Sequence, residues 1–162
     1  SSAESWNAVR REDGALTGLK IARDRGLVGH IGISSHSLNV LEEAIDCGEF
    51  EAVMLEYSAF YHQTESLLAL ARERDVGVIA MRPLGGSGRM SGVRAQMQAG
   101  GGDVALTPGL LLRYVLSHPD VSVAIPGARY PSRIRYNVDV ALAYEPLSRD
   151  ERSACETVAS LF

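Results

Sequence analysis

The stretch "IPGARYPSRIRYN" at residues 125–137 gathers positive charge directly after an apolar run. Three arginines occur within seven positions: Arg129, Arg133 and Arg135. Gly127 allows a ligand to approach the backbone closely, and a helix that starts near Pro131 has free amide N–H groups that favour an anion. Arg133 carries the unfavourable charge for a first helical turn. The pattern therefore indicates an anion site, with Asn137 one turn further on.

A second interpretation of the same stretch stays open. Only Lys20 among the sixteen basic residues is a lysine, so arginine is the default cation of this chain. Under this interpretation, the three arginines are ordinary surface residues.

Other polar residues follow apolar runs elsewhere in the chain. In "ISSH", Ser34 and Ser35 fit either ligand hydrogen bonding or, for Ser35, the start of a helix cap. His36 fits either an acid–base group or a turn residue. Glu56 is the only carboxylate within a predicted strand and needs a partner if it is buried. No spacing typical of a catalytic triad, a metal site or a P-loop occurs, so we predict no catalytic residue and no metal ligand from pattern alone.

Helical and strand patterns alternate along the chain with short connections. Helices are predicted at 14–26, 37–48, 64–75, 107–119, 131–143 and 148–162, and strands at 30–35, 52–60, 77–84 and 121–127. Repeated βα units with apolar strands indicate an α/β fold with a parallel sheet. In such a fold ligands bind at the carboxyl ends of the strands, which is where the polar residues above lie.

A glycine-rich stretch at 85–102 interrupts this alternation. It is long for an internal loop, which predicts either a functional flap or a disordered segment.

Composition excludes several classes of function. The 162 residues are 46% hydrophobic with a net charge of −4, which argues against general binding to nucleic acid or anionic membranes. No apolar run is long enough to span a bilayer, and the N-terminus has no signal-peptide pattern. Cys47 and Cys155 lack metal-ligand spacing, and their spacing is not typical of a disulfide framework. The simplest expectation is a cytoplasmic protein, and the missing initial methionine suggests a processed or excised segment.

Three segments in order, "LKIARDRGLVGHIGISSHS", "LALARERDVGVIAMRPLGG" and "LLLRYVLSHPDVSVAIPGARYPSRIRYN", resemble the C-terminal half of an aldo-keto reductase. The resemblance runs from about residue 14 to 160. It implies strands 5–8 of a (β/α)8 TIM barrel, about four βα units plus a C-terminal helix. "AIDCGEFEAVMLEYS" and "MRPLGG" look closest to the branch that often carries a C-terminal iron–sulfur extension, whose cysteine cluster is absent here.

The resemblance also implies a cradle for NADP(H). We expect it to comprise Ser34, Ser35, Met81, Arg82, Pro83, Leu84, Gly85, Gly127, Arg133 and Asn137. Ser34 matches the serine on the nicotinamide carboxamide, and Met81 to Gly85 match the segment along the nicotinamide ring and the pyrophosphate. Arg133 matches the arginine that holds the adenosine 2′-phosphate, which suits its fork of donors. Asn137 matches the asparagine on adenine.

Three positions depart from the family pattern. Ser35 stands where many members have asparagine, Met54 where many have glutamine, and Tyr136 where glutamate is common. The nicotinamide clamp and the adenine contact are therefore expected to be built differently here.

The catalytic Asp, Tyr, Lys and His of this family come from the first four strands, which have no counterpart in the sequence. We therefore expect a lead-in at 1–13, a half-barrel at 14–162, and no carbonyl reductase activity from this chain alone. A half-barrel has open sheet edges, so we expect a dimer or a missing N-terminal half, with a small-molecule carbonyl as substrate of the complete enzyme. Two alternatives stay open: a non-catalytic α/β module that binds a nucleotide or phosphate, and a degenerate structural remnant that binds nothing.

Overall fold

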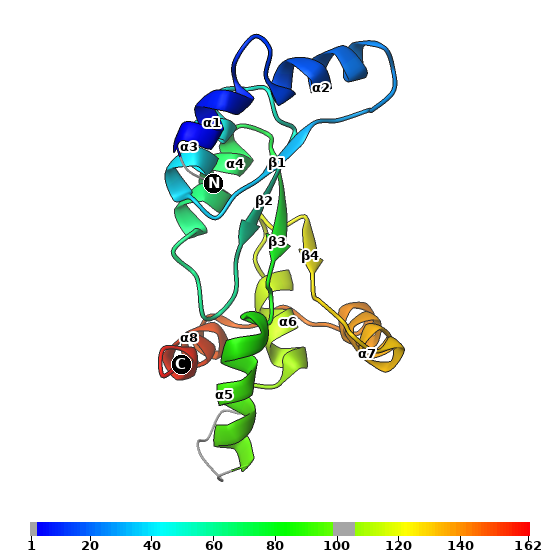
Figure 1. Ribbon diagram of the computed structural model, residues 1–162. Coiled ribbons are helices and arrows are strands. Elements are labelled where there is room, and N and C mark those ends of the chain that lie inside the picture. Colours follow the sequence, from blue (N-terminus) through cyan, green and yellow to red (C-terminus); the bar gives the residue numbers. More distant parts are fainter. Residues whose placement is uncertain (1–2, 99–105) are drawn as a thin grey trace. The chain divides into compact units, whose positions relative to one another are not determined.

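The computed structural model describes residues 3–98 and 106–162. Its strands are β1 (Gly32–Ser34), β2 (Ala52–Glu56), β3 (Gly77–Met81) and β4 (Val123–Ile125) (Figure 1). Its helices are α1 (Ala3–Val9), α2 (Ala15–Asp24), α3 (Leu38–Asp46), α4 (Glu65–Glu73), α5 (Gly86–Gln98), α6 (Pro108–Leu116), α7 (Pro131–Leu142) and α8 (Arg149–Ala159). The predicted alternation of strands and helices is confirmed.

The strands form one sheet in the order β1-β2-β3-β4. β1 and β2 are parallel, with Ser34 opposite Met54. β2 and β3 are joined at both ends, because the Gly77 N–H donates to the Glu51 carbonyl (2.9 Å) and the Tyr57 N–H donates to the Met81 carbonyl (3.3 Å). Strand order therefore follows chain order, as expected when each crossover returns to the adjacent position.

The chain divides into two compact units, and the division runs through β2 and β3. The first comprises Ser1–Leu55 and Thr64–Ile79, and the second comprises Glu56–Gln63 and Ala80–Phe162. Each unit has buried side chains of its own, so the two are described in turn.

The core of the first unit is built around α1, which the sequence patterns do not predict. Its buried members are Trp6, Leu16, Ile31, Val40, Ala44 and Phe50. The Trp6 indole is 3% exposed, and its N–H donates to the Glu43 carboxylate at 2.6 Å. Arg10 lies over the same ring at 5.1 Å and pairs with Glu43 at 3.3 Å. The expected lead-in at 1–13 thus contributes a helix and a buried aromatic residue.

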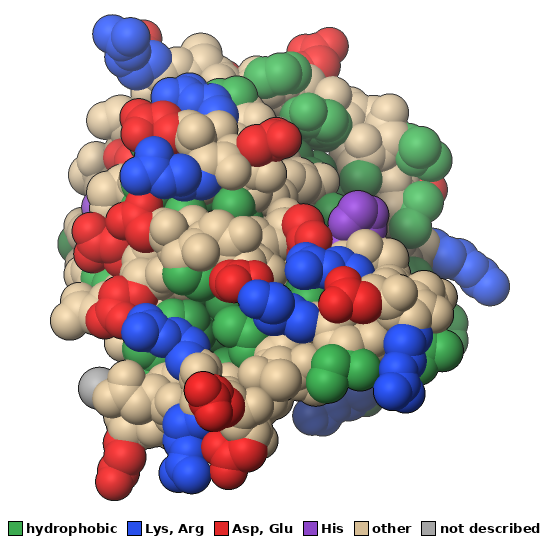
Figure 2. All heavy atoms as spheres, turned by 90° about the horizontal axis from the view of Figure 1, so that it is seen from above, with side chains coloured by type: hydrophobic (Ala, Val, Ile, Leu, Met, Phe, Trp, Pro, Cys, Tyr) green, Lys and Arg blue, Asp and Glu red, His purple; other side chains and the backbone are tan. Residues whose placement is uncertain are grey.

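Charged side chains of the first unit are largely paired. The pairs include Arg10–Glu43, Arg11–Asp13, Lys20–Glu49, Arg23–Glu51 and Arg74–Asp46. Figure 2 shows acidic and basic side chains interspersed over the face seen from above. Exposed pairs of this kind each contribute little to stability, about 0–1 kcal/mol.

Helix caps in the second unit follow the sequence pattern. The Thr107 side chain accepts a hydrogen bond from the Leu110 N–H at 3.1 Å, with Pro108 in the first turn. Ser148 and Glu151 form a reciprocal capping box at the start of α8. Both predicted helix starts are confirmed. Ser37 and Thr64 occupy the N-cap positions of α3 and α4, but neither side chain makes the capping hydrogen bond.

The glycine-rich stretch differs from the prediction. Residues 86–98 form α5, so the expectation of a flap or a disordered loop is wrong for them, and 99–102 lie outside the described residues. Met90 and Val93, one helical turn apart, are both buried, and Arg89 lies over the Phe60 ring at 5.8 Å. Tertiary contacts thus hold a helix whose own glycines disfavour it.

The second strand is shorter than the predicted 52–60. After Glu56 the chain turns, and Ser58 and Tyr61 exchange backbone hydrogen bonds of 3.2 and 2.9 Å. Residues 58–61 therefore leave the sheet and form a tight connection at its carboxyl edge.

Glu51 connects several elements of the first unit, and its acidity predicts how stability varies with pH. Its carboxylate accepts the Ile31 N–H at 2.7 Å and pairs with Arg23 at 3.1 Å. The Ile31 N–H, ahead of the pair with Arg23, lowers the pKa of Glu51 below its ordinary value of 4.5. A lowered folded-state pKa stabilises the fold above the unfolded pKa, and this stabilisation is lost as pH falls through the folded pKa.

We therefore predict that Glu51→Gln lowers the urea midpoint at pH 7. The variant should also lose less stability than the wild type between pH 5 and pH 3, because the titrating carboxylate is gone. Urea unfolding followed by circular dichroism at each pH measures both effects. Glu42→Gln, at an exposed carboxylate on α3, is the control, and equal behaviour of the two variants would contradict the role of Glu51.

Candidate functional site

In the first unit, the end of β1 presents one serine and buries the next. Ser34 is exposed, whereas Ser35 is 4% exposed. The Ser35 Oγ accepts a hydrogen bond from the Ser37 N–H at 3.0 Å, and its own N–H donates to the Met54 carbonyl at 3.2 Å. Ser35 therefore takes part in the turn into α3, and Ser34 is the serine available to a ligand.

In the second unit, the segment after β3 has an unusual backbone. Arg82 has a φ of +52° and Gly85 a φ of +76°, and the Gly85 N–H donates to the Arg82 carbonyl at 2.8 Å. Left-handed conformations are rare for arginine, so surrounding contacts must hold this turn. Pro83 is buried inside it, and Leu84 and Met81 are half-buried. The turn leads directly into α5.

The end of β4 leads into α7 through an open loop. A Cβ added at Gly127 would meet nothing within 4 Å, which leaves this strand end accessible. Tyr130 is the N-cap of α7 but supplies no side-chain cap, and Pro131 begins the helix. Pro131 has no N–H, and the Arg133 and Ile134 N–H groups donate to the Tyr130 carbonyl at 3.0 and 3.4 Å. Of the first three residues of α7, only Ser132 can therefore offer its N–H to an anion.

Arg133 and Asn137 lie one turn apart on α7 and so share a face. The Arg133 guanidinium lies over the Tyr130 ring at 5.3 Å, and no carboxylate pairs with it among residues 3–98 and 106–162. Asn137 is 9% exposed, the only residue of α7 classed as buried. An unpaired arginine fork above a buried amide suits a phosphate attached to a planar base.

The other residues of this stretch lie elsewhere. Arg129 and Arg135 are exposed, in keeping with ordinary surface arginines. Tyr136 turns toward α6, where a Cβ on Gly109 would lie 2.6 Å from the Tyr136 hydroxyl. Tyr136 therefore belongs to the contact between α6 and α7, beside a groove of about 470 Å³.

A buried hydrogen-bond network that sequence patterns do not indicate ties α8 to α6 and to the turn after β2. Arg152 donates to the Tyr57 hydroxyl at 3.0 Å and to the Tyr114 hydroxyl at 3.2 Å, and its guanidinium stacks over Tyr114 at 4.3 Å. The Tyr114 hydroxyl donates to Glu156 at 2.7 Å. Both tyrosines are fully buried. Burial, and then the bond to Glu156, raise the pKa of Tyr114 far above its ordinary value.

This network argues against a catalytic tyrosine in it. A phenol with a strongly raised pKa stays protonated and is a weak acid. Tyr57 is inaccessible and held by Arg152.

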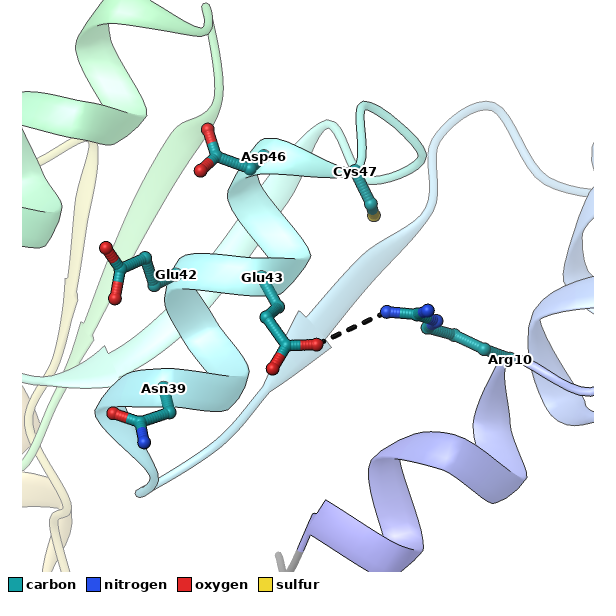
Figure 3. A pocket seen from close by; sticks show the side chains of 6 residues that line it. All are labelled: Arg10, Asn39, Glu42, Glu43, Asp46 and Cys47. Atoms are coloured by element: carbon teal, nitrogen blue, oxygen red, sulfur yellow. Dashed lines mark hydrogen bonds and ion pairs between the residues drawn. The ribbon is translucent and has the colours of Figure 1, made fainter.

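A charged hollow lies on the surface of the first unit (Figure 3). It measures about 600 Å³ and is lined by Arg10, Asn39, Glu42, Glu43, Asp46 and Cys47. Figure 3 shows Glu43 turned toward Arg10. Glu43 also accepts the Trp6 indole N–H, so Glu43 and Arg10 support the core at this hollow.

Two further features bear on the sequence predictions. Cys47 and Cys155 are both free thiols, as expected. Within the described ranges, no cluster of side chains has the make-up of a metal site, and no helix has the length and apolar character to cross a bilayer.

These features together describe a parallel βα protein with polar groups at its strand ends. The model of the aldo/keto reductase family matches residues 11–107, more than half of the chain. The chain belongs to the aldo/keto reductase family.

Two curated proteins are similar to this chain. An aldo-keto reductase of Gibberella moniliformis is 38% identical over 73 residues, which are 44% of this chain and 22% of that protein. An uncharacterized oxidoreductase of Bacillus subtilis is 22% identical over 169 residues, covering 90% of this chain and 55% of that protein.

Solved structures establish the fold. The holo form of aldo-keto reductase AKR11C1 from Bacillus halodurans matches with a TM-score of 0.72 and 22% identity, over 93% of this chain and 57% of that one. The aldose reductase from Schistosoma japonicum matches with a TM-score of 0.62 and 21% identity, over 88% and 45%. The fold is a partial TIM barrel of four parallel strands alternating with helices, as predicted. The chain spans about half the length of these proteins.

The Arg152 network predicts a measurable loss of stability. Arg152→Met should lower the free energy of unfolding by about 2–3 kcal/mol, because it leaves the buried Tyr57 and Tyr114 hydroxyls short of a charged donor. Urea unfolding of the purified chain measures this. Arg149→Met is the control on the same helix, at an exposed arginine, and a similar loss in both variants would show that the network contributes nothing.

Proposed function

We propose that this chain is the NADP(H)-binding half of an aldo-keto reductase barrel, corresponding to its strands 5–8. Family membership and the parallel strands with polar carboxyl ends support this. The whole reaction reduces a small carbonyl compound, and NADPH, when bound, supplies the hydride. The tyrosine that protonates the carbonyl oxygen belongs to the first four strands, so this chain alone has no reductase activity.

One observation carries the proposal, namely that Arg133 and Asn137 lie one turn apart on the same face of α7. The arginine fork has no carboxylate partner among the described residues and lies in the first turn of a helix whose N–H groups lack a side-chain cap. A 2′-phosphate would bind the guanidinium, and the adjacent base would meet the Asn137 amide. An isolated surface arginine would give no reason for a buried asparagine one turn away.

The other predicted cradle residues are assigned by their position. Ser34 is exposed at the end of β1 and would hold the nicotinamide carboxamide. In the second unit, the segment from Met81 to Gly85 turns sharply after β3 and would lie along the nicotinamide ring and the pyrophosphate. Ser35 is already engaged in the turn into α3 and would act on the cofactor only through that turn.

We predict that Arg133→Ala weakens NADPH binding by about tenfold to a hundredfold, because a charge-assisted bond to the 2′-phosphate is lost. NADH binding should change little, because that cofactor lacks the phosphate. Titration of the purified chain, followed by NADPH fluorescence, measures both affinities. Arg135→Ala is the matched control, two residues away on the same helix.

Two results would contradict this assignment. Equal losses of NADPH affinity in Arg133→Ala and Arg135→Ala would mean that each arginine acts only through its general positive charge. Binding of inorganic phosphate as strong as NADPH binding would instead favour a non-catalytic phosphate-binding module.

A half-barrel also leaves apolar surface that a complete barrel would cover. Along α7, four exposed apolar side chains recur every four residues: Tyr130, Ile134, Val138 and Leu142. β4 is an edge strand, and Val123 and Ile125 are about half exposed. A free edge strand and an apolar helix face invite association. We therefore propose that this surface of the second unit receives a companion barrel half, and that the isolated chain self-associates through it.

We predict that light scattering of the isolated chain shows species larger than a monomer at micromolar concentration. The double variant Val138→Glu with Leu142→Glu should shift the population toward monomer, because the charges disrupt the apolar face. Arg135→Glu, also on α7, serves as the control for added negative charge. A monodisperse monomer of the unmodified chain would contradict the proposal.

A further inference from the structure

Glu56, the last residue of β2, is a nearly buried carboxylate with two arginine partners. Its side chain is 11% exposed; Oε2 lies 3.1 Å from an Arg82 guanidinium nitrogen, and Oε1 lies 3.5 Å from one of Arg89. A carboxylate at this depth requires cationic partners. Here the two partners come from the two ends of one short segment.

That segment, 82–89, runs from the end of β3 into α5. Its first residue, Arg82, has a positive φ of +52°, and Gly85 and Gly86 have φ values of +76° and +79°. Three left-handed residues in five positions make a tight reversal that few side chains tolerate. Such a reversal persists only where contacts outside it fix both of its ends.

Phe60 supplies a second contact to the same segment. A Cβ on Gly85 would overlap the Phe60 ring, so the Gly85 backbone lies directly against this ring. The Arg89 guanidinium lies over the ring at 5.8 Å. Glu56 and the short connection that follows it thus contact segment 82–89 at three places. Glu56 contacts its start, Phe60 contacts its middle, and both contact its end at Arg89.

We propose that Glu56 is a positioning residue that holds segment 82–89 in the conformation that binds the cofactor. The inference rests on the proposed function, because Met81 to Gly85 are the part of the cradle assigned to the nicotinamide and the pyrophosphate. Glu56 itself contacts no cofactor in this account. It orders the segment before the ligand arrives, so the ligand does not have to do so.

Electrostatics alone and positioning predict opposite changes in NADPH affinity for Glu56→Gln, which makes the proposal testable. Removing the carboxylate leaves Arg82 and Arg89 with less compensated positive charge beside an anionic ligand. If charge alone decided affinity, Glu56→Gln would bind NADPH more tightly. If positioning decides it, the same variant binds more weakly, because the segment loses its anchor at both ends.

The experiment measures NADPH affinity and backbone amide hydrogen exchange in the purified chain. Glu56→Gln is expected to weaken NADPH binding by about tenfold and to speed exchange in 83–92, without cofactor, by about fivefold or more. Glu42→Gln, which removes an exposed carboxylate from α3, is expected to change neither. Unchanged or tighter binding together with unchanged exchange in Glu56→Gln would overturn the proposal.

Two further variants test the proposal even if Glu56→Gln does not fold. Arg89→Met removes one partner and should loosen the segment, whereas Arg89→Lys keeps the charge and should restore protection. A purely structural role for the bulk of Arg89 would make these two variants alike, which would overturn the proposal.

The two proposals fail in different ways. If the unmodified chain binds no NADPH, the proposed function fails, and exchange in 83–92 still decides whether Glu56 holds the segment. If the chain binds NADPH but Glu56→Gln changes neither amide exchange nor NADPH affinity, only the positioning role of Glu56 is disproved.

Discussion

Parallel strands cannot be joined by a tight turn, so each strand of this sheet is followed by a helix that returns the chain to the start of the next. β2 and β3 are an example of such neighbours. They are hydrogen-bonded to each other at one end through Glu51 and Gly77 and at the other through Tyr57 and Met81. Because the strands are parallel, their carboxyl ends meet at one edge of the sheet. In each unit polar residues follow the strands directly, while β2 and β3 bury the apolar residues of alternate positions. Local placement of the candidate site thus follows from strand direction, before any side chain is considered.

Most elements of this fold can be predicted from the sequence because local signals and tertiary packing favour the same structure. Thr107 with Pro108, and Ser148 with Glu151, mark helix starts through caps that need only neighbouring residues. Helix α5 is different, because its glycines disfavour helix and it depends on the burial of Met90 and Val93. Helix α1 likewise depends on burying Trp6 in a core assembled from later residues. Local reasoning fails where long-range packing overrides propensity.

The candidate site divides in the same way. Arg133 and Asn137 are one turn apart, so spacing on a single helix brings them to one face. Glu56 was expected to need a partner, but the sequence could not say which arginine of an arginine-rich chain would meet it. The contact between Arg152 and Tyr57 spans 95 positions, and no periodicity encodes it. Residues that support a site from distant elements are found only once the fold is known.

We propose that this chain forms a cofactor cradle and that the catalytic residues of the complete enzyme come from other strands. Backbone amide NMR of the isolated chain, titrated with NADPH, tests this most directly because it reports on every segment at once. We predict shifts at Ser34 in the first unit, and at Met81 to Gly85 and Gly127 to Asn137 in the second, each saturating with NADPH. Shifts confined to the groove between α6 and α7 would contradict it, as would no shift at saturating NADPH.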